Sequence, residues 1–193
     1  MIKESIYHKT ERTINLEHEQ IKKAQHNVTD FAPLYDSYFL AIFNYVLKRV
    51  QDEHQAAEIT SDIFAKALFK ISTYSFKGLP FSSWLYRIAR NQIIDFYRKD
   101  KSNKYLQVSE DELNYLADNS DKDIDTAVDK ENKTKQLVLA LGKLSDENIE
   151  LIELKFFENR SYKEIAAIIN TNENNARVKT NRALAKLKDL INK

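Results

Sequence analysis

The sequence contains no cysteine, and it has only two glycines and two prolines among its 193 residues. The absence of cysteine excludes disulfide bonds, thiolate metal sites and a catalytic thiol. So few helix breakers argue against a β-rich protein and favour a mostly helical one. No apolar run approaches the roughly 18 residues of a membrane span, and the N-terminus lacks the apolar core of a signal peptide. We therefore expect an all-α, cytoplasmic protein without a membrane partner.

Patterns for catalysis or metal binding are also lacking. Asp62 and Asp95 have no convergent partner for acid–base chemistry, and no Gly-rich phosphate loop occurs. The histidines lack metal-ligand spacing and are interpreted as surface residues: His8, His18, His26 and His54. The sequence therefore predicts a protein that is not an enzyme and that needs no metal and no cofactor.

Charge is present but unevenly distributed, although the formal net charge is only +1. Residues 87–104 carry six cations against two anions, and residues 177–193 carry six cations against one anion. Between them, residues 110–131 carry nine anions against two cations, a net charge of −7. Two basic blocks that flank an acidic one carry information that the overall isoelectric point hides.

The hydrophobic pattern divides the chain into two small helical domains. The expected segments are an N-terminal tail (1–14), a first helical domain (15–103), an acidic flexible linker (104–130) and a second helical domain (131–193). Helical periodicity in the first domain covers 16–24, 31–47 and 56–71. Residues 74–80 contain a glycine and a proline and form the strongest break. A basic helix follows, with Ser82 or Ser83 as its expected N-terminal cap.

The basic helix is the most informative segment, and residues 81–98 read FSSWLYRIARNQIIDFYR. At 3.6 residues per turn, Arg87, Asn91 and Arg98 share one face, with Arg90 beside them. Taken alone, the tryptophan would more often be a core residue and the arginines a solvated helix face. Together with the aromatic break before them, they suit a nucleic acid whose bases are exposed for stacking.

The second domain has the pattern of a helix-turn-helix. Ser161 and Glu164 have the spacing of a capping box, which begins a short helix. Residues 170–172 read Asn-Thr-Asn and break that helix, because asparagine tolerates the left-handed conformation of a tight turn. Residues 173–191 then form a helix with a basic exposed side. Any short helix pair can mimic this pattern, so on its own it is a weak indication of DNA binding.

Two blocks of the sequence, in order and spacing, resemble the extracytoplasmic-function (ECF) sigma factors of the sigma-70 family. Residues 56–98 resemble sigma region 2, and residues 161–183 resemble region 4. The resemblance implies a promoter-specific initiation factor that binds core RNA polymerase and catalyses nothing itself. The run AAEITSDIF at 56–64 is similar to the family's contact with the polymerase clamp helices. It implies core polymerase binding through Glu58, Ile59, Asp62 and Ile63.

The same resemblance assigns two DNA surfaces. Residues 74–81 correspond to the loop that captures a flipped base of the −10 element, and the next helix lies on the separated strands. The expected −10 residues are Tyr74, Phe76, Phe81, Trp84, Arg87, Arg90, Asn91, Arg98 and Lys99. Region 4 implies reading of the −35 element, for which the expected residues are Asn174, Asn175, Arg177, Val178, Lys179, Asn181, Arg182 and Lys186. The usual turn glycine is Asn170 here, and the usual small residues at the start of the recognition helix are Glu173, Asn174 and Asn175. The promoter sequence read by the family therefore cannot be carried over to this chain.

Within these sets the residue types predict different roles. Arg87, Arg90, Arg98 and Lys99 are expected to bind backbone phosphates, whereas the four aromatic residues are expected to grip bases. In the last helix, Arg177 and Asn181 share a face and suit the major-groove edges of guanine and adenine. Lys179 and Lys186 are better placed for phosphates.

Two rival interpretations come from other functional classes. A polymerase-independent regulator would share the helix-turn-helix but would leave residues 74–98 unexplained. A helical adaptor without nucleic acid would leave both basic helices unexplained. The favoured partners are core RNA polymerase and promoter DNA, with an anti-sigma factor left open. The free chain is expected to be a monomer that binds DNA weakly, because a flexible linker leaves its domains without a fixed spacing. The acidic linker is expected to occupy a positively charged polymerase channel.

Overall fold

A computed structural model describes residues 11–100 and 136–191, except for the side chains of Glu11, Lys99 and Asp100. Within these two ranges every regular element is helical and no strand occurs, which confirms the predicted all-α class. No helix in these ranges is long and apolar enough to cross a membrane. The predicted acidic linker 104–130 and most of the predicted tail lie outside the described residues.

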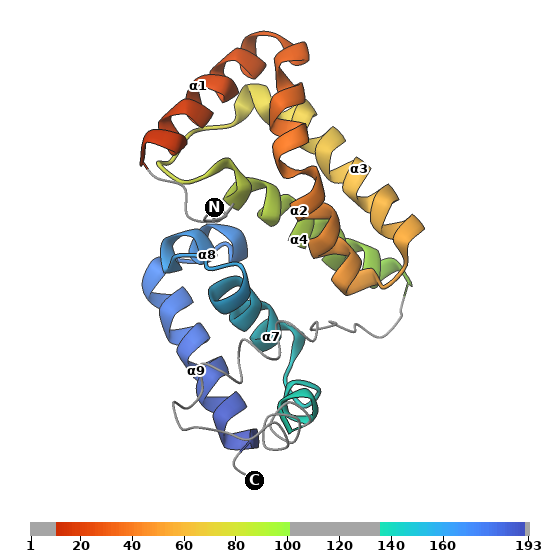
Figure 1. The fold of residues 1–193 in the computed structure, drawn as a ribbon, viewed down its shortest axis with the longest axis vertical. Helices are drawn as coiled ribbons and strands as arrows, with labels where there is room; N and C mark the ends of the chain where they lie inside the picture. Colours follow the sequence, from red (N-terminus) through yellow and green to blue (C-terminus); the bar gives the residue numbers. More distant parts are fainter. Residues whose placement is uncertain (1–10, 101–135, 192–193) are drawn as a thin grey trace, which may run out of the picture.

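The first group of helices occupies the upper half of Figure 1. Its elements are α1 (Glu11–His26), the 3-10 turn η1 (Val28–Phe31), α2 (Ala32–Val50), α3 (Glu53–Lys70), the 3-10 turn η2 (Ile71–Thr73) and α4 (Phe81–Asp100). Helix α1 starts inside the predicted 1–14 tail, because polar residues of good helix propensity can extend a helix beyond its apolar pattern. Between α2 and α3, Gln51 adopts a left-handed conformation with φ 57°, and Asp52 Oδ1 accepts a hydrogen bond from the Gln55 amide at 2.8 Å.

The start of α4 differs from the prediction that Ser82 or Ser83 caps it. Both serines lie inside the helix and are buried. The Phe81 amide instead donates a hydrogen bond to Glu17 Oε2 of α1 at 2.8 Å. The cap therefore comes from a residue 64 positions earlier, which local sequence rules do not detect.

The second group contains helical residues 136–141, α7 (Asp146–Ile152), a π-helical turn η3 (Glu153–Phe157), α8 (Tyr162–Ile169) and α9 (Glu173–Ile191). The capping box is present: the Glu164 amide donates to Ser161 Oγ at 3.2 Å, and the Ser161 amide donates to Glu164 Oε2 at 2.9 Å. Asn170 is left-handed with φ 58°, and Asn172 Oδ1 accepts from the Asn175 amide at 2.8 Å. The predicted helix-turn-helix is thus confirmed.

The two groups share one hydrophobic core. Buried residues of the first group, such as Tyr38 and Leu85, belong to the same cluster as Leu154 and Ile165 of the second group. Helix α8 lies against α4, where the two groups meet in Figure 1. The two groups therefore pack against each other and bury apolar surface between them, which differs from the expectation that their spacing is not fixed.

Candidate nucleic-acid interface

Three aromatic residues gather where the 74–80 loop meets α4. The ring centroid of Phe81 lies 5.4 Å from that of Tyr74 and 5.3 Å from that of Trp84, and the latter two are 4.9 Å apart. Tyr74 and Trp84 are half-buried, whereas Phe81 is fully buried. The prediction that Phe81 itself contacts a base disagrees with this burial. Its ring instead packs beneath the rings of Tyr74 and Trp84 in the core.

The other predicted aromatic residue of the loop, Phe76, stacks on His18 of α1. Their ring centroids lie 4.1 Å apart with an interplanar angle of 19°. Gly78 in the same loop has φ 67°, a backbone conformation that side chains disfavour. Burial, followed by the charge of Glu17, raises the pKa of Tyr74 to about 12, so its hydroxyl stays protonated at neutral pH.

The predicted phosphate-binding cations of α4 have three different environments. Arg87 is half-buried in a cleft, and Arg98 is exposed with Nη2 2.9 Å from Asp95 Oδ1. The Nε of Arg90 donates a hydrogen bond to Glu150 Oε2 of α7 at 2.9 Å. Asn91 is exposed, whereas the Lys99 side chain lies outside the described part of the chain.

The cleft beside Arg87 has a volume of about 760 Å³ and lies between the two helix groups. Trp84, Arg87 and Asn91 line one side, and Asn170 and Glu173 at the helix-turn-helix line the other. Lysines add positive charge to its wall at Lys70, Lys77 and Lys163. The candidate −10 surface therefore faces α8 and the start of α9 across a basic cleft.

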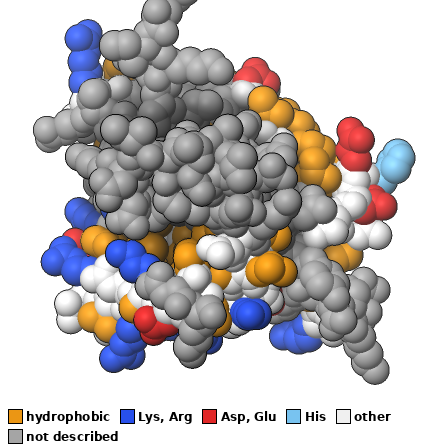
Figure 2. Space-filling model, turned by 60° about the horizontal axis from the view of Figure 1, so that its bottom comes forward, with side chains coloured by type: hydrophobic (Ala, Val, Ile, Leu, Met, Phe, Trp, Pro, Cys, Tyr) orange, Lys and Arg blue, Asp and Glu red, His pale blue; other side chains and the backbone are white. Residues whose placement is uncertain are grey.

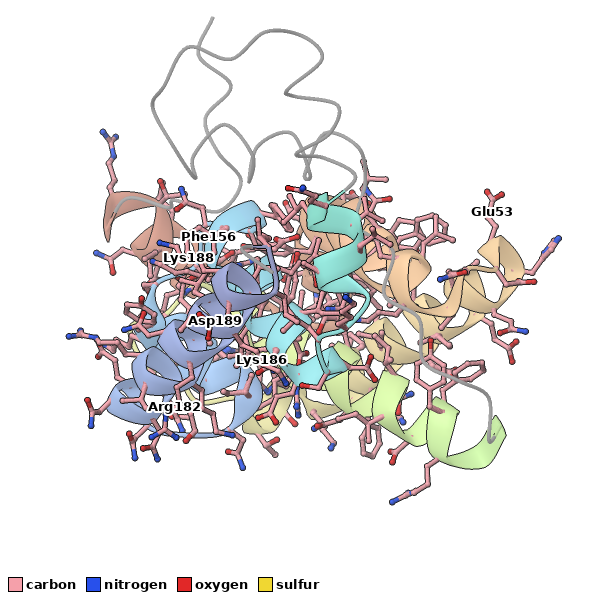
Figure 3. All side chains as sticks on the ribbon, turned by 90° about the horizontal axis from the view of Figure 1, so that it is seen from below. Glu53, Phe156, Arg182, Lys186, Lys188 and Asp189 are labelled. Atoms are coloured by element: carbon pink, nitrogen blue, oxygen red, sulfur yellow. The ribbon has the colours of Figure 1, made fainter. Side chains whose placement is uncertain are left out.

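The candidate −35 surface lies on α9 and is open. All of its predicted residues are exposed: Asn174, Asn175, Arg177, Val178, Lys179, Asn181, Arg182 and Lys186. Figure 3 places Arg182 and Lys186 along α9, far from Glu53 at the start of α3. In Figure 2, Lys and Arg side chains gather along the lower left, the side on which α9 lies.

Tyr162 of α8 contacts two of the predicted base-reading residues. Its hydroxyl donates to Asn181 Oδ1 at 3.3 Å, and the Arg177 guanidinium lies 5.3 Å from its ring centroid. The Nη2 of Arg177 also lies 3.6 Å from Oε1 of Glu173. The first helix of the pair thus helps to orient the side chains of the second.

The predicted polymerase-binding set divides by burial. Glu58 and Asp62 are exposed on α3, whereas Ile59 is 9% exposed and Ile63 is fully buried. Residues four apart on a helix share a face, so one pair points outward and the other into the core. The prediction of direct contact is consistent with the two acidic residues but not with the two isoleucines, which pack in the core.

Sequence reasoning missed a polar network between the helix groups. Glu150 of α7 accepts hydrogen bonds from Arg90 and from the Tyr45 hydroxyl, each at 2.9 Å. Glu153 pairs with Arg49 at 2.5 Å and lies 3.8 Å from Lys48 Nζ. Burial lowers the pKa of Arg49, but the charge of Glu153 offsets this and leaves the pKa above its ordinary value.

A second part of this network is centred on Arg160, which is 1% exposed. Its Nη1 donates to Ser82 Oγ of α4 at 2.8 Å and to Glu164 Oε1 at 3.2 Å. The Tyr86 hydroxyl of α4 donates to Glu158 Oε2 at 2.8 Å. Burial raises the pKa of Glu158, and the nearby charge of Glu153 adds to this effect. Buried charges of this kind need partners: Arg160 has Glu164 in its own group, and Ser82 and Tyr86 of the other group complete the network.

One signal in the sequence pointed to this network. Residues 149–154 read IELIEL, in which two glutamates interrupt an otherwise apolar run. Carboxylates are rarely buried without partners, so acidic residues in a core segment indicate buried cations nearby. Local patterns do not identify these cations, since Arg49 lies 104 positions from Glu153 and Arg90 lies 60 positions from Glu150, both in the other helix group.

Comparisons with known proteins agree with this architecture. The family model for sigma-70 region 2 matches residues 34–103, and the model for sigma-70 region 4 matches residues 134–187. ECF RNA polymerase sigma factor SigW of Bacillus subtilis (strain 168) is 30% identical over 159 residues, which cover 78% of this chain and 82% of SigW. ECF RNA polymerase sigma factor BldN of Streptomyces coelicolor is 28% identical over 174 residues, which cover 90% of this chain but only 65% of BldN.

A solved structure shares the fold. CnrH, in its complex with the cytosolic domain of CnrY, superposes with a TM-score of 0.57 at 21% identity, covering 90% of this chain and 95% of that one. The all-helical fold, the helix-turn-helix and the two family models define a sigma-70 type transcription initiation factor. The chain belongs to the ECF RNA polymerase sigma factors. Proteins of this family bind core RNA polymerase and promoter DNA.

Proposed function

We propose that the chain directs core RNA polymerase to promoters by reading the −35 element with α9 and holding the melted −10 element with the 74–80 loop and α4. The observation that carries this proposal is the pairing, in one chain, of an open basic recognition helix with an aromatic cluster beside a basic cleft. The first suits the major groove of duplex DNA, and the second suits unpaired bases. We also propose that the 15–103 and 131–193 segments are the two domains that carry these tasks.

The division of labour follows from the side chains. Trp84 and Tyr74 offer half-buried rings on which an unpaired base can stack. Arg87 and Arg98 supply positive charge for the phosphates of that strand. On α9, Arg177 and Asn181 have the chemistry to read base edges, and Lys186 has that of a phosphate contact.

Promoter binding then requires the two helix groups to separate. The two DNA elements are about 25 base pairs apart, or about 85 Å at about 3.4 Å per base pair. In this structure the cleft that holds Trp84 and Arg87 is closed on its other side by Asn170 and Glu173, next to the recognition helix. We propose that docking on core polymerase replaces the contact between the groups and sets the spacing that the promoter needs.

Run-off transcription with purified core polymerase tests this function. We expect transcription only with both components, and a Trp84→Ala variant should lose more activity on duplex promoter than on DNA already melted over the −10 element. Lys143→Ala, an exposed change away from both surfaces, is the control. Tight sequence-specific DNA binding by the chain alone, without stimulation of core polymerase, would instead support a polymerase-independent regulator.

A further inference from the structure

Helix α1 contacts the 71–81 segment at its beginning, its middle and its end. At the beginning, Gln25 Nε2 donates to the Ile71 carbonyl at 3.0 Å and to the Tyr74 carbonyl at 2.8 Å. In the middle, His18 stacks on Phe76. At the end, Glu17 accepts the Phe81 amide at 2.8 Å. The segment has no regular structure between Thr73 and Phe81, so these contacts substitute for a hydrogen-bonded element.

We infer that α1 holds the base-capture loop in its working shape, with Gln25 as the positioning residue. This inference rests on the proposed −10 function. Gln25 ties the backbone at Tyr74, and the Tyr74 ring packs directly against Trp84. A loop fixed in advance loses less conformational entropy when it binds a base. Because Gln25 does not belong to the candidate DNA surface, it acts through the loop.

The chemistry of Gln25 is specific. One amide nitrogen with two N–H groups reaches two carbonyl oxygens, so each proton of the NH₂ group has an acceptor. Gln25→Ala removes both hydrogen bonds. Gln25→Glu keeps the size of the side chain but places a carboxylate, which only accepts hydrogen bonds, against two carbonyl oxygens. The loss should therefore be greater for glutamate than for alanine.

The same helix supplies a matched control. Gln20 is also half-buried, and its Nε2 donates to a backbone carbonyl, that of Asp30, at 2.7 Å. Asp30 belongs to the η1 turn and not to the capture loop. Gln20→Ala thus removes the same kind of bond from the same helix without touching the 71–81 segment.

The experiment uses the full chain assembled with core polymerase. Two DNA probes are compared: a fork with a single-stranded −10 element, with or without the base expected to flip, and a −35 duplex alone. In wild type, removing that base should weaken binding of the fork. Gln25→Ala should weaken binding of the intact fork about five- to hundredfold, as for two lost hydrogen bonds. Gln25→Glu should weaken it further, and Gln20→Ala should match wild type.

The outcomes separate this inference from the function on which it rests. A wild-type protein that is indifferent to the −10 base would refute the capture function itself. Base-dependent binding by wild type, with Gln25→Glu equal to Gln20→Ala, would overturn only the role of Gln25. Equal losses on the fork and the −35 duplex, with a lowered unfolding temperature, would likewise overturn it by showing a purely structural residue. Loss confined to the fork supports the positioning role.

Discussion

The two candidate DNA surfaces of this chain differ in what lies against them. On α9, the predicted base-reading and phosphate-binding side chains are exposed, among them Arg182 and Lys186 in Figure 3. On α4, Arg90 is held by Glu150, and Arg87 faces the helix-turn-helix across a cleft. The candidate −35 surface is exposed in the free chain, whereas part of the candidate −10 surface faces the helix group that carries the first. The Glu150 carboxylate accepts the Nε hydrogen of Arg90 and would compete with a DNA phosphate for this side chain.

This difference has an energetic basis in the buried network. Arg49 and Glu153 lose their hydration when they are buried between the helix groups. Their mutual attraction offsets only part of the free energy that this dehydration costs. Tyr45 and Tyr86 hydroxyls satisfy further carboxylate oxygens across the same boundary. The boundary between the groups thus combines shared apolar core residues with hydrogen-bonded charges, and under the proposed function this boundary would open when polymerase and promoter are bound.

The largest effect is expected for Glu153→Ala. This change leaves the Arg49 guanidinium buried without its carboxylate, and breaking a buried pair typically costs about 3–5 kcal/mol. Arg49 regains water if the groups separate, so we expect the domains to part rather than each to unfold. Small-angle X-ray scattering should show a larger radius of gyration. Glu147→Ala is the control, because Glu147 lies in α7, directly before the turn that holds Glu153, but pairs with exposed Lys179 within its own group. An unchanged radius for Glu153→Ala would contradict the role of the network.

Arg177→Ala and Asn181→Ala should have intermediate effects, limited to recognition of the −35 element by α9. Each bidentate contact with a base edge contributes about 1–3 kcal/mol of discrimination. We expect each variant to relax the base preference at one or two −35 positions, measured by selecting a randomised −35 library with the polymerase complex. Preferences identical to those of wild type would show that α9 does not enter the major groove by its N-terminal end.

Lys186→Ala should have a smaller effect of another kind. A lysine on phosphate adds affinity for every sequence and contributes about 0.9 to the slope of log affinity against log salt. We expect weaker binding to all −35 sequences alike and a shallower salt dependence, measured by titration at several salt concentrations. An altered base preference for Lys186→Ala would instead show that Lys186 contacts a base edge and not only a phosphate.

The smallest expected effect is a pH dependence of stability that arises from Tyr45, at the boundary between the two helix groups. Burial raises the pKa of Tyr45 well above its ordinary value of 10, and the charges of Glu150 and Glu153 act in the same direction against that of Arg49. Above pH 10 the unfolded chain loses this proton while the folded chain keeps it. Stability therefore falls as pH rises, by about 1.4 kcal/mol per pH unit for one proton. Denaturant unfolding of Tyr45→Phe should show a shallower decline above pH 10 than wild type does. Equal slopes would count against burial of this hydroxyl.

The same contrast explains what sequence reasoning could predict. Helix α9 and its turn follow from local rules: the Ser161 cap, the left-handed Asn170 and the alternation of exposed cations with buried alanines. The surface on α4 depends on contacts that local rules do not detect. Glu17 caps α4 from a distant helix, Phe81 is buried by neighbours from α2, and Arg90 meets a carboxylate of the other group. Periodicity predicts which residues lie on a face, but tertiary packing decides what covers that face.

The most direct test is to measure DNA binding by the free chain, without polymerase, for wild type and for Glu153→Ala. The two probes are a single-stranded −10 oligonucleotide and a −35 duplex. If α4 is covered and α9 is open, the variant should bind the single strand about tenfold more tightly or better, because more of it is in the competent state. Its affinity for the −35 duplex should change less than about twofold. Equal changes for both probes, or no change for the single strand, would contradict the account.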